Sequence, residues 1–221
     1  MKGQVTIQSA IDELQRMFKL LNATYFNNEL ERPVITILTD YKGGSYGWIS
    51  INKDWSSKEG AWFREINLSA EYLNRPVELV ITTLGHEMAH LHNIQQGIKD
   101  CSRKGNSYHN AHFKAAAEMV GLIVEQHHTN GWCITKPGPE FTALVEKHCR
   151  AGCFKLERMK TYRDGTPKIT KPGEGGKEVT TSRTKQSYRK HTCPGCGLTA
   201  RTTRDGELKC NTCDQIMIIG A

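Results

Sequence analysis

The run His86-Glu87-Met88-Ala89-His90 combines two imidazoles with a carboxylate at a spacing that can support hydrolytic chemistry. On a helix, residues four apart lie on one face with Cβ atoms about 5–6 Å apart, so His86 and His90 can bind one zinc ion. Glu87 projects about 100° further around the helix, where its carboxylate can reach a metal-bound water. The pattern predicts a zinc-activated water nucleophile with Glu87 as its general base.

A catalytic zinc takes three protein ligands and keeps one position open, so a third ligand must come from outside this motif. His109, His112 and Glu118 all follow within one loop and one expected helix. His92 shares a helix with His90 but lies about 200° around it, so it points away from the metal. The spacing alone leaves the first three candidates open.

Four cysteines near the C-terminus predict a second metal site. Cys193 and Cys196 form one Cys-x-x-Cys pair, and Cys210 and Cys213 form another after a short polar stretch. Four thiolates close the coordination sphere of zinc, so this site would be structural. Residues 191–221 have few apolar side chains, and we expect this zinc ribbon to need the metal to fold. Two disulfides or a redox pair are the alternatives.

The other potential metal ligands are given simpler roles. Since four cysteines already suffice, His191 is expected at the ribbon surface. Cys149 and Cys153 are interpreted as buried thiols, with a metal pair as the alternative. Cys101 and Cys133 stay unassigned.

Hydrophobic periodicity indicates the elements that must hold these residues in place. The expected elements are a helix over 7–26, strands over 33–38, 46–51 and 62–68, a helix through the histidine motif, and helices over 110–120 and 139–148. The motif helix is expected to have Asn74 as its cap and Pro76 in its first turn. Its apolar stripe, from Val77 to Leu91, fixes one face to the core and leaves a neighbouring face for the histidines.

Charge and composition divide the chain into three parts. The net charge is +7, and the segment 155–190 alone holds eleven Lys and Arg against four Asp and Glu. This segment is almost without apolar residues, so it cannot offset its ordering entropy. We therefore expect an α+β, zincin-like domain over 1–153, a flexible basic linker over 154–190 and a zinc ribbon over 191–221. The linker and the ribbon are the candidate contacts to DNA.

The stretches from His86 to Leu91 and from Tyr108 to Lys114 resemble the metalloprotease core of the SprT-like family. The resemblance spans roughly residues 8 to 150 and includes Tyr46-Gly47-Trp48. It implies that the third zinc ligand is His109, four positions before a phenylalanine. It also implies an endopeptidase that acts on protein bound or crosslinked to DNA. His112 stands where a member of the family carries an acidic residue.

Zinc proteases commonly pair a substrate strand with a sheet edge, and the strand 62–68 is the candidate edge here. Ile66 and Trp48 are the expected substrate-binding residues, although aromatic residues such as Tyr46, Trp48 and Trp55 also suit a core. Ile66→Pro would then abolish cleavage.

No run reaches the about 20 apolar residues of a membrane helix, and no signal peptide is indicated, so a cytoplasmic protein is expected, with nucleoid association as an option. The rival hypothesis is a nucleic-acid-binding or regulatory zinc protein whose zincin domain cleaves nothing. Hydrolysis of a non-peptide amide is a third hypothesis. The sequence does not indicate an oligomeric state.

Overall fold

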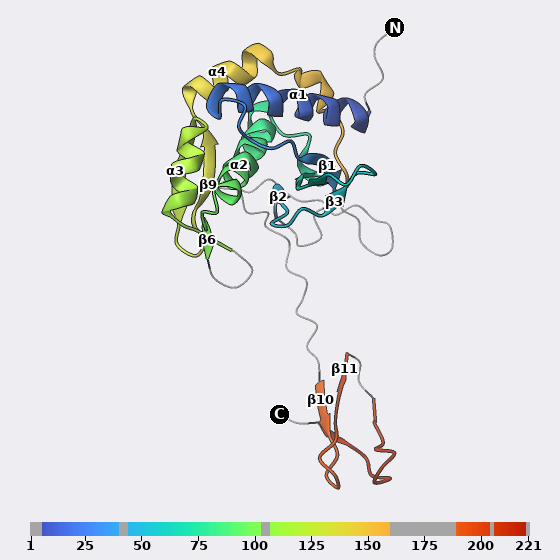
Figure 1. The fold of residues 1–221 in the computed structure, drawn as a ribbon. Coiled ribbons are helices and arrows are strands. Elements are labelled where there is room, and N and C mark those ends of the chain that lie inside the picture. The colour runs from blue at the N-terminus through green and yellow to red at the C-terminus, as the bar shows by residue number, and fades with distance from the viewer. Residues whose placement is uncertain (1–5, 40–43, 103–106, 160–188, 204–205, 220–221) are drawn as a thin grey trace. The chain divides into compact units, whose positions relative to one another are not determined.

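The computed structural model describes residues 6–39, 44–102, 107–159, 189–203 and 206–219 (Figure 1). The chain forms two compact units, Met1–Lys168 and Ile169–Ala221. Most of the expected basic linker, residues 160–188, lies outside the described residues.

Four α-helices belong to the first unit, and all four expected helices are confirmed. They are α1 (Ile7–Tyr25), α2 (Val77–Gln95), α3 (Ala111–Met119) and α4 (Pro139–His148). A capping box between Thr6 and Ser9 starts α1. The cap expected at Asn74 is wrong, and so is the place of Pro76 in the first turn, because Pro76 is itself the N-cap residue and α2 begins at Val77.

The first sheet has the order β1-β5-β2, formed by β1 (Val34–Leu38), β5 (Glu65–Ser69) and β2 (Gly47–Ile49). β1 is parallel to β5, and β2 is antiparallel to it. The expected strand 62–68 is split, because β4 (Trp62–Phe63) pairs instead with β3 (Trp55–Ser56).

The prediction that Ile66 lies on a substrate-binding edge strand is wrong. β5 is the central strand and Ile66 pairs with Ile35 on one side and Ile49 on the other. All five residues of β5 are buried. The polar residue Glu65 can be buried there because its carboxylate accepts hydrogen bonds from Thr36 and from the Trp55 indole.

A second sheet in this unit has the order β6-β7-β9-β8. Its strands are β6 (Cys101–Ser102), β7 (Tyr108–His109), β9 (Gly131–Pro137) and β8 (Leu122–His127). The β8–β9 hairpin was not predicted from the sequence. It matters for the site because β9 packs directly against α2.

The helix α2 is the centre of the first unit (Figure 1), since it packs against α1, α3, α4, β2, β5 and β9. Its predicted apolar stripe begins at Val77, which is partly buried, and continues with residues that are inaccessible to solvent: Val80, Ile81, Leu84, Met88 and Leu91. No helix in the described parts of the chain is long and apolar enough to cross a membrane.

The second unit contains β10 (Arg189–Thr192), β11 (Thr199–Thr202) and β12 (Ile218–Ile219) in the order β11-β10-β12. Its buried apolar cluster consists of Cys193, Cys210 and Met217. The expectation that His191 lies at the surface is wrong. In β10 it points into the unit, with 1% of its surface exposed, and its Nε2 lies 3.0 Å from Thr202 Oγ1.

Candidate metal centres

Three imidazoles converge in the first unit. His86 and His90 come from α2 and His109 comes from β7, and their nitrogen atoms lie within 4.8 Å of one another. The Nε2 atoms of His90 and His109 are 3.1 Å apart. The structure therefore brings the two histidines of the motif together with the third ligand that the family resemblance implies.

These separations fit a shared metal ion. Two nitrogens bound to one tetrahedral zinc at about 2.0–2.1 Å lie about 3.3–3.4 Å apart, close to the observed His90–His109 spacing. The outward ring nitrogens have other neighbours: His86 Nδ1 lies 3.1 Å from Thr135 Oγ1, and His90 Nδ1 lies 2.7 Å from Asp100 Oδ2. His109 Nδ1 is buried without a hydrogen-bond partner in the described residues.

The other candidate ligands lie elsewhere. His112 and Glu118 are exposed on α3, where Glu118 pairs with Lys114. His92 packs against the ring of Phe26 on another face of α2. His109 lies in β7, directly before the expected helix, because Asn110 caps α3 and the helix begins at Ala111.

Phe113 forms the floor under the three imidazoles and was not predicted as a site residue. Its ring centroid lies 4.5, 4.4 and 4.5 Å from those of His86, His90 and His109, and its side chain is fully buried. It follows His109 by four residues in the first turn of α3. A buried ring in this position restricts the three imidazoles by packing, in addition to their hydrogen bonds.

Burial shifts the titration of the groups in this cluster. It lowers the pKa of His86 well below its usual value, with the neighbouring His90 and His109 acting in the same direction. It lowers the pKa of His109 to about 4, reinforced by His90. The two imidazoles are therefore neutral at pH 7, which is the form that binds metals.

Glu87 lies beside the histidines and is 5% exposed. Burial raises its pKa to about 7; His90 opposes that shift and Asp100 adds to it. A carboxylate with a pKa near 7 can both accept and return a proton at neutral pH.

Asp100 and Cys101 adjoin the cluster. Burial acts to raise the pKa of Asp100, but hydrogen bonds from His90 and Asn93 outweigh it and lower the value. Burial and the neighbouring Asp100 raise the pKa of Cys101 to about 12. Cys101 is thus a thiol at neutral pH.

The strand β2 runs against α2 at the position of Glu87. A Cβ added at Gly47 would lie 2.9 Å from Thr83 Cγ2 and 3.3 Å from Glu87 Oε1. Trp48 is 38% exposed on β2 and Trp55 is 45% exposed on β3, so neither is a core residue. Tyr46 instead packs against Tyr72.

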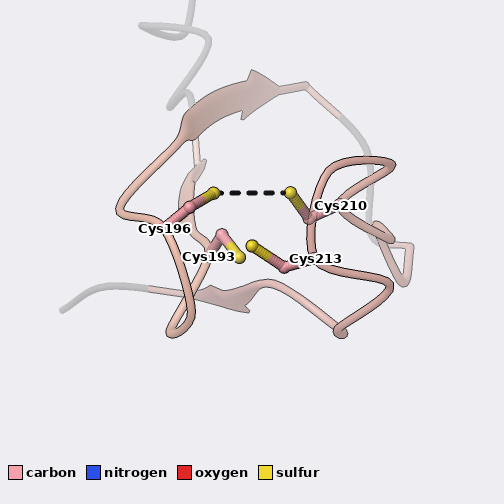
Figure 2. Close-up of side chains that lie close together, drawn as sticks. All are labelled: Cys193, Cys196, Cys210 and Cys213. Carbon is pink, nitrogen blue, oxygen red and sulfur yellow. Dashed lines mark hydrogen bonds between the residues drawn. The ribbon is translucent and has the colours of Figure 1, made fainter.

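The ribbon cysteines form the second centre (Figure 2), with all four sulfur atoms within 4.8 Å of one another. Cys196 Sγ and Cys210 Sγ are 3.7 Å apart. A disulfide would bring them to about 2.05 Å, whereas two thiolates on one zinc lie about 3.8 Å apart. Backbone amides of Cys213 and Thr212 lower the pKa of Cys210, whereas the hydrogen bond to Cys196 raises the pKa of Cys213. The donor set fits zinc.

Of the remaining cysteines, Cys101 lies with His90 and Asp100 in a group of potential metal ligands that shares His90 with the imidazole cluster, and the other three belong to no such group in the described residues. Cys133, Cys149 and Cys153 are half-buried free thiols. The alternative of a Cys149–Cys153 metal pair is without a third ligand in that part of the chain.

Comparison with known proteins gives one match. The model of the SprT-like family matches residues 14–136, more than half of the 221 residues. The matched region contains all three clustered histidines and Glu87. Searches of curated proteins and of solved structures gave no significant match.

Proposed function

The chain belongs to the SprT-like family, and from this premise we propose that it is a zinc-dependent endopeptidase. The observation that carries the proposal is the convergence of His86, His90 and His109 beside the buried carboxylate of Glu87. A purely structural metal site would have no use for that carboxylate. A fourth coordination position would remain for a water molecule.

In this proposal the three imidazoles hold the metal and Glu87 moves the proton. Zinc, when bound, supplies a Lewis acid that activates water at neutral pH and polarises the scissile carbonyl. Glu87 accepts the proton of the attacking water at a carboxylate oxygen. It then passes a proton to the nitrogen of the leaving amine.

We place the substrate along β2, in a zincin-like arrangement. Tyr46 O and Ser50 N bond to β5, so by the alternation of an antiparallel pair the backbone groups of Gly47 and Ile49 face the other side. No strand occupies that side within the described residues. An extended peptide added there would run beside Glu87, with Trp48 projecting near its side chains.

Ile49→Pro tests this placement, because it removes an outward N–H without removing a bond to β5. We expect kcat/KM to fall by about tenfold, the value of one lost hydrogen bond. Zinc content should not change. Ile49→Val keeps the N–H and is the matched control. Equal cleavage by both variants would place the substrate elsewhere.

DNA-associated proteins are the proposed substrate class. Lys190 and Arg201 are exposed cross-strand partners in the ribbon, so they share one face. The segment 155–190, mostly outside the described residues, carries an excess of seven positive charges. Such charges bind phosphates without reading sequence. Of the expected boundaries 1–153, 154–190 and 191–221, the linker is shorter at both ends, because Phe154 is buried in the core of the first unit and Arg189 and Lys190 belong to β10. We retain the three-part order and a cytoplasmic location as proposals.

The deciding experiment compares the wild type with Glu87→Gln on a DNA-bound protein, with and without DNA. We expect the wild type to cleave and the variant to lose at least about 100-fold in rate. Both should contain two zinc ions per chain. Cleavage by the variant would refute Glu87 as the base. DNA binding without cleavage by a fully metal-loaded wild type would instead support the nucleic-acid-binding alternative.

A further inference from the structure

Asp100 contacts both segments that supply the clustered imidazoles. Its Oδ2 lies 2.7 Å from Nδ1 of His90 on α2. Its backbone carbonyl accepts a hydrogen bond of 2.9 Å from the backbone N–H of Asn110, the residue after His109. The next residue, Cys101, pairs with His109 across β6 and β7. Asp100 thus links the position of His90 on α2 to that of His109 on β7.

The carboxylate itself is held in place. Asp100 is 7% exposed, and the side-chain amide of Asn93, 2% exposed, donates to the same Oδ2 at 3.1 Å. Asn93 is three residues after His90 on α2, so both donors approach from one helix face. Since a carboxylate only accepts, Nδ1 of His90 carries the proton and Nε2 is left free to bind a metal.

The other two imidazoles are supported differently. His86 Nδ1 meets the neutral hydroxyl of Thr135. His109 Nδ1 is buried and has no hydrogen-bond partner in the described residues. Of the three, His90 is the one whose outer nitrogen meets a carboxylate within the described part of the chain. The ring with charged support also lies closest to His109, with Nε2 atoms 3.1 Å apart.

We propose that Asp100 is a positioning residue of the metal centre: it fixes the tautomer and orientation of His90 and increases the affinity of the cluster for zinc. The inference rests on the proposed function, since it assumes a metal at the three histidines. Carboxylate partners of metal-bound histidines typically contribute 10–100-fold to metal affinity. The linkage to Asn110 lets the same residue set the spacing between His90 and His109.

Two substitutions at Asp100 separate its effects. Asp100→Asn removes the charge but keeps an oxygen that can accept from His90, and we expect zinc affinity to fall about tenfold. Asp100→Ala removes both, and we expect a fall of about 100-fold. Affinity is measured on the full chain by competition with a chelator. Cobalt substitution distinguishes the centres, because thiolate and imidazole ligands give different absorption spectra.

Glu13→Gln is the control for a merely structural effect. Glu13 is a fully buried carboxylate in the same unit, bound by Arg16 and Arg150 away from the histidines. The Glu13→Gln substitution should lower the free energy of unfolding of the first unit while leaving the cobalt spectrum and the zinc affinity unchanged.

Three outcomes would overturn the inference. In the first, both Asp100 variants bind zinc as tightly as the wild type does. In the second, Glu13→Gln weakens zinc binding as much as the Asp100 variants do. In the third, the wild type gives only the thiolate-type cobalt spectrum. The last outcome would overturn the proposed function as well, whereas the first two would leave it standing.

Discussion

The imidazole cluster lies on a large apolar core, whereas the thiol cluster makes up most of its own core. Under the three histidines, Phe113 joins a core drawn from all four helices and from the two larger sheets of the first unit. In the ribbon, the buried apolar cluster consists of Cys193, Cys210 and Met217, and the two cysteines belong to the candidate zinc site. The first unit can therefore position its ligands by packing, while the ribbon must rely on the metal.

This difference separates what metal removal should do to each unit. A structural zinc contributes its binding energy directly to folding, whereas a metal bound to a preformed site adds to an existing stability. We therefore expect the loss of a ribbon ligand to unfold the ribbon, and the loss of a ligand in the first unit to remove activity while the fold is retained.

Cys210→Ser should produce the largest effect. Structural zinc in small domains contributes about 10–16 kcal/mol, more than a unit with three buried apolar residues can replace. We expect the ribbon to unfold and the zinc content to fall from two to one per chain. Amide NMR spectra would show ribbon resonances collapsing while those of the first unit persist. A folded ribbon in this variant would contradict the comparison.

His109→Ala should remove the metal of the first unit without unfolding it. The buried core beneath the site does not depend on His109, so helical circular dichroism should be retained. Zinc affinity should fall by more than about 100-fold, beyond the effect of an outer-shell group. His112→Ala is the matched control on an exposed neighbour and should bind zinc normally. Reversed results would make His112 the ligand.

Phe113→Ala tests whether packing positions the histidines. Truncating a fully buried phenylalanine should cost about 3–5 kcal/mol of unfolding free energy. Phe113→Leu keeps most of the volume and should cost less than about 1.5 kcal/mol. Zinc affinity should follow the same order, measured by chelator competition. Unchanged affinity in the alanine variant would show that the imidazoles are held without this floor.

The helices and the motif histidines were predictable because their signals are local. The spacing of His86 and His90 and the apolar stripe of α2 require only helical periodicity. The ribbon cysteines are similarly local. The choice of His109 as the third ligand depended on the family resemblance, because spacing alone does not distinguish it from His112, three residues later.

The failures concern relations between distant segments. Glu65 and Asn67 alternate with Ile66 as in a half-exposed strand, yet β5 is central and buried. Glu65 can be buried there because Thr36 and Trp55, from two other strands, donate hydrogen bonds to its carboxylate. Sequence alternation does not reveal such partners. The prediction for His191 was wrong for the same reason, since its hydrogen-bond partner, Thr202, lies on the neighbouring strand β11. The β8–β9 hairpin did have a local signal in the sequence, the Asn130-Gly131 pair, whose glycine has a φ of 68° in the structure.

The smallest effects are expected at two ion pairs, a buried one in the first unit and an exposed one in the ribbon. Glu13 is fully buried and accepts from Arg16 at 2.5 Å and from Arg150 at 2.6 Å, which joins α1 to the segment after α4. Burial alone would raise its pKa, but these hydrogen bonds lower it from 4.5 to about 2. In the ribbon, Lys209 and Asp214 form a pair whose side chains are 59% and 86% exposed.

A lowered carboxylate pKa stabilises the folded state above the unfolded-state value and is lost as the pH falls towards the folded-state value. Glu13 should therefore contribute about 2 kcal/mol at pH 7, reduced by solvent screening of the two arginines. Glu13→Gln should lose this at pH 7 and differ little from the wild type near pH 2. Asp214→Asn should change the unfolding free energy of the ribbon by less than about 0.5 kcal/mol at pH 7. It is measured only there, because protonated thiols would release the zinc of the ribbon at low pH. Denaturation of the Glu13→Gln variant between pH 2 and 7 measures the effect in the first unit, and a difference from the wild type that did not shrink on acidification would show that packing rather than charge joins α1 to the segment after α4.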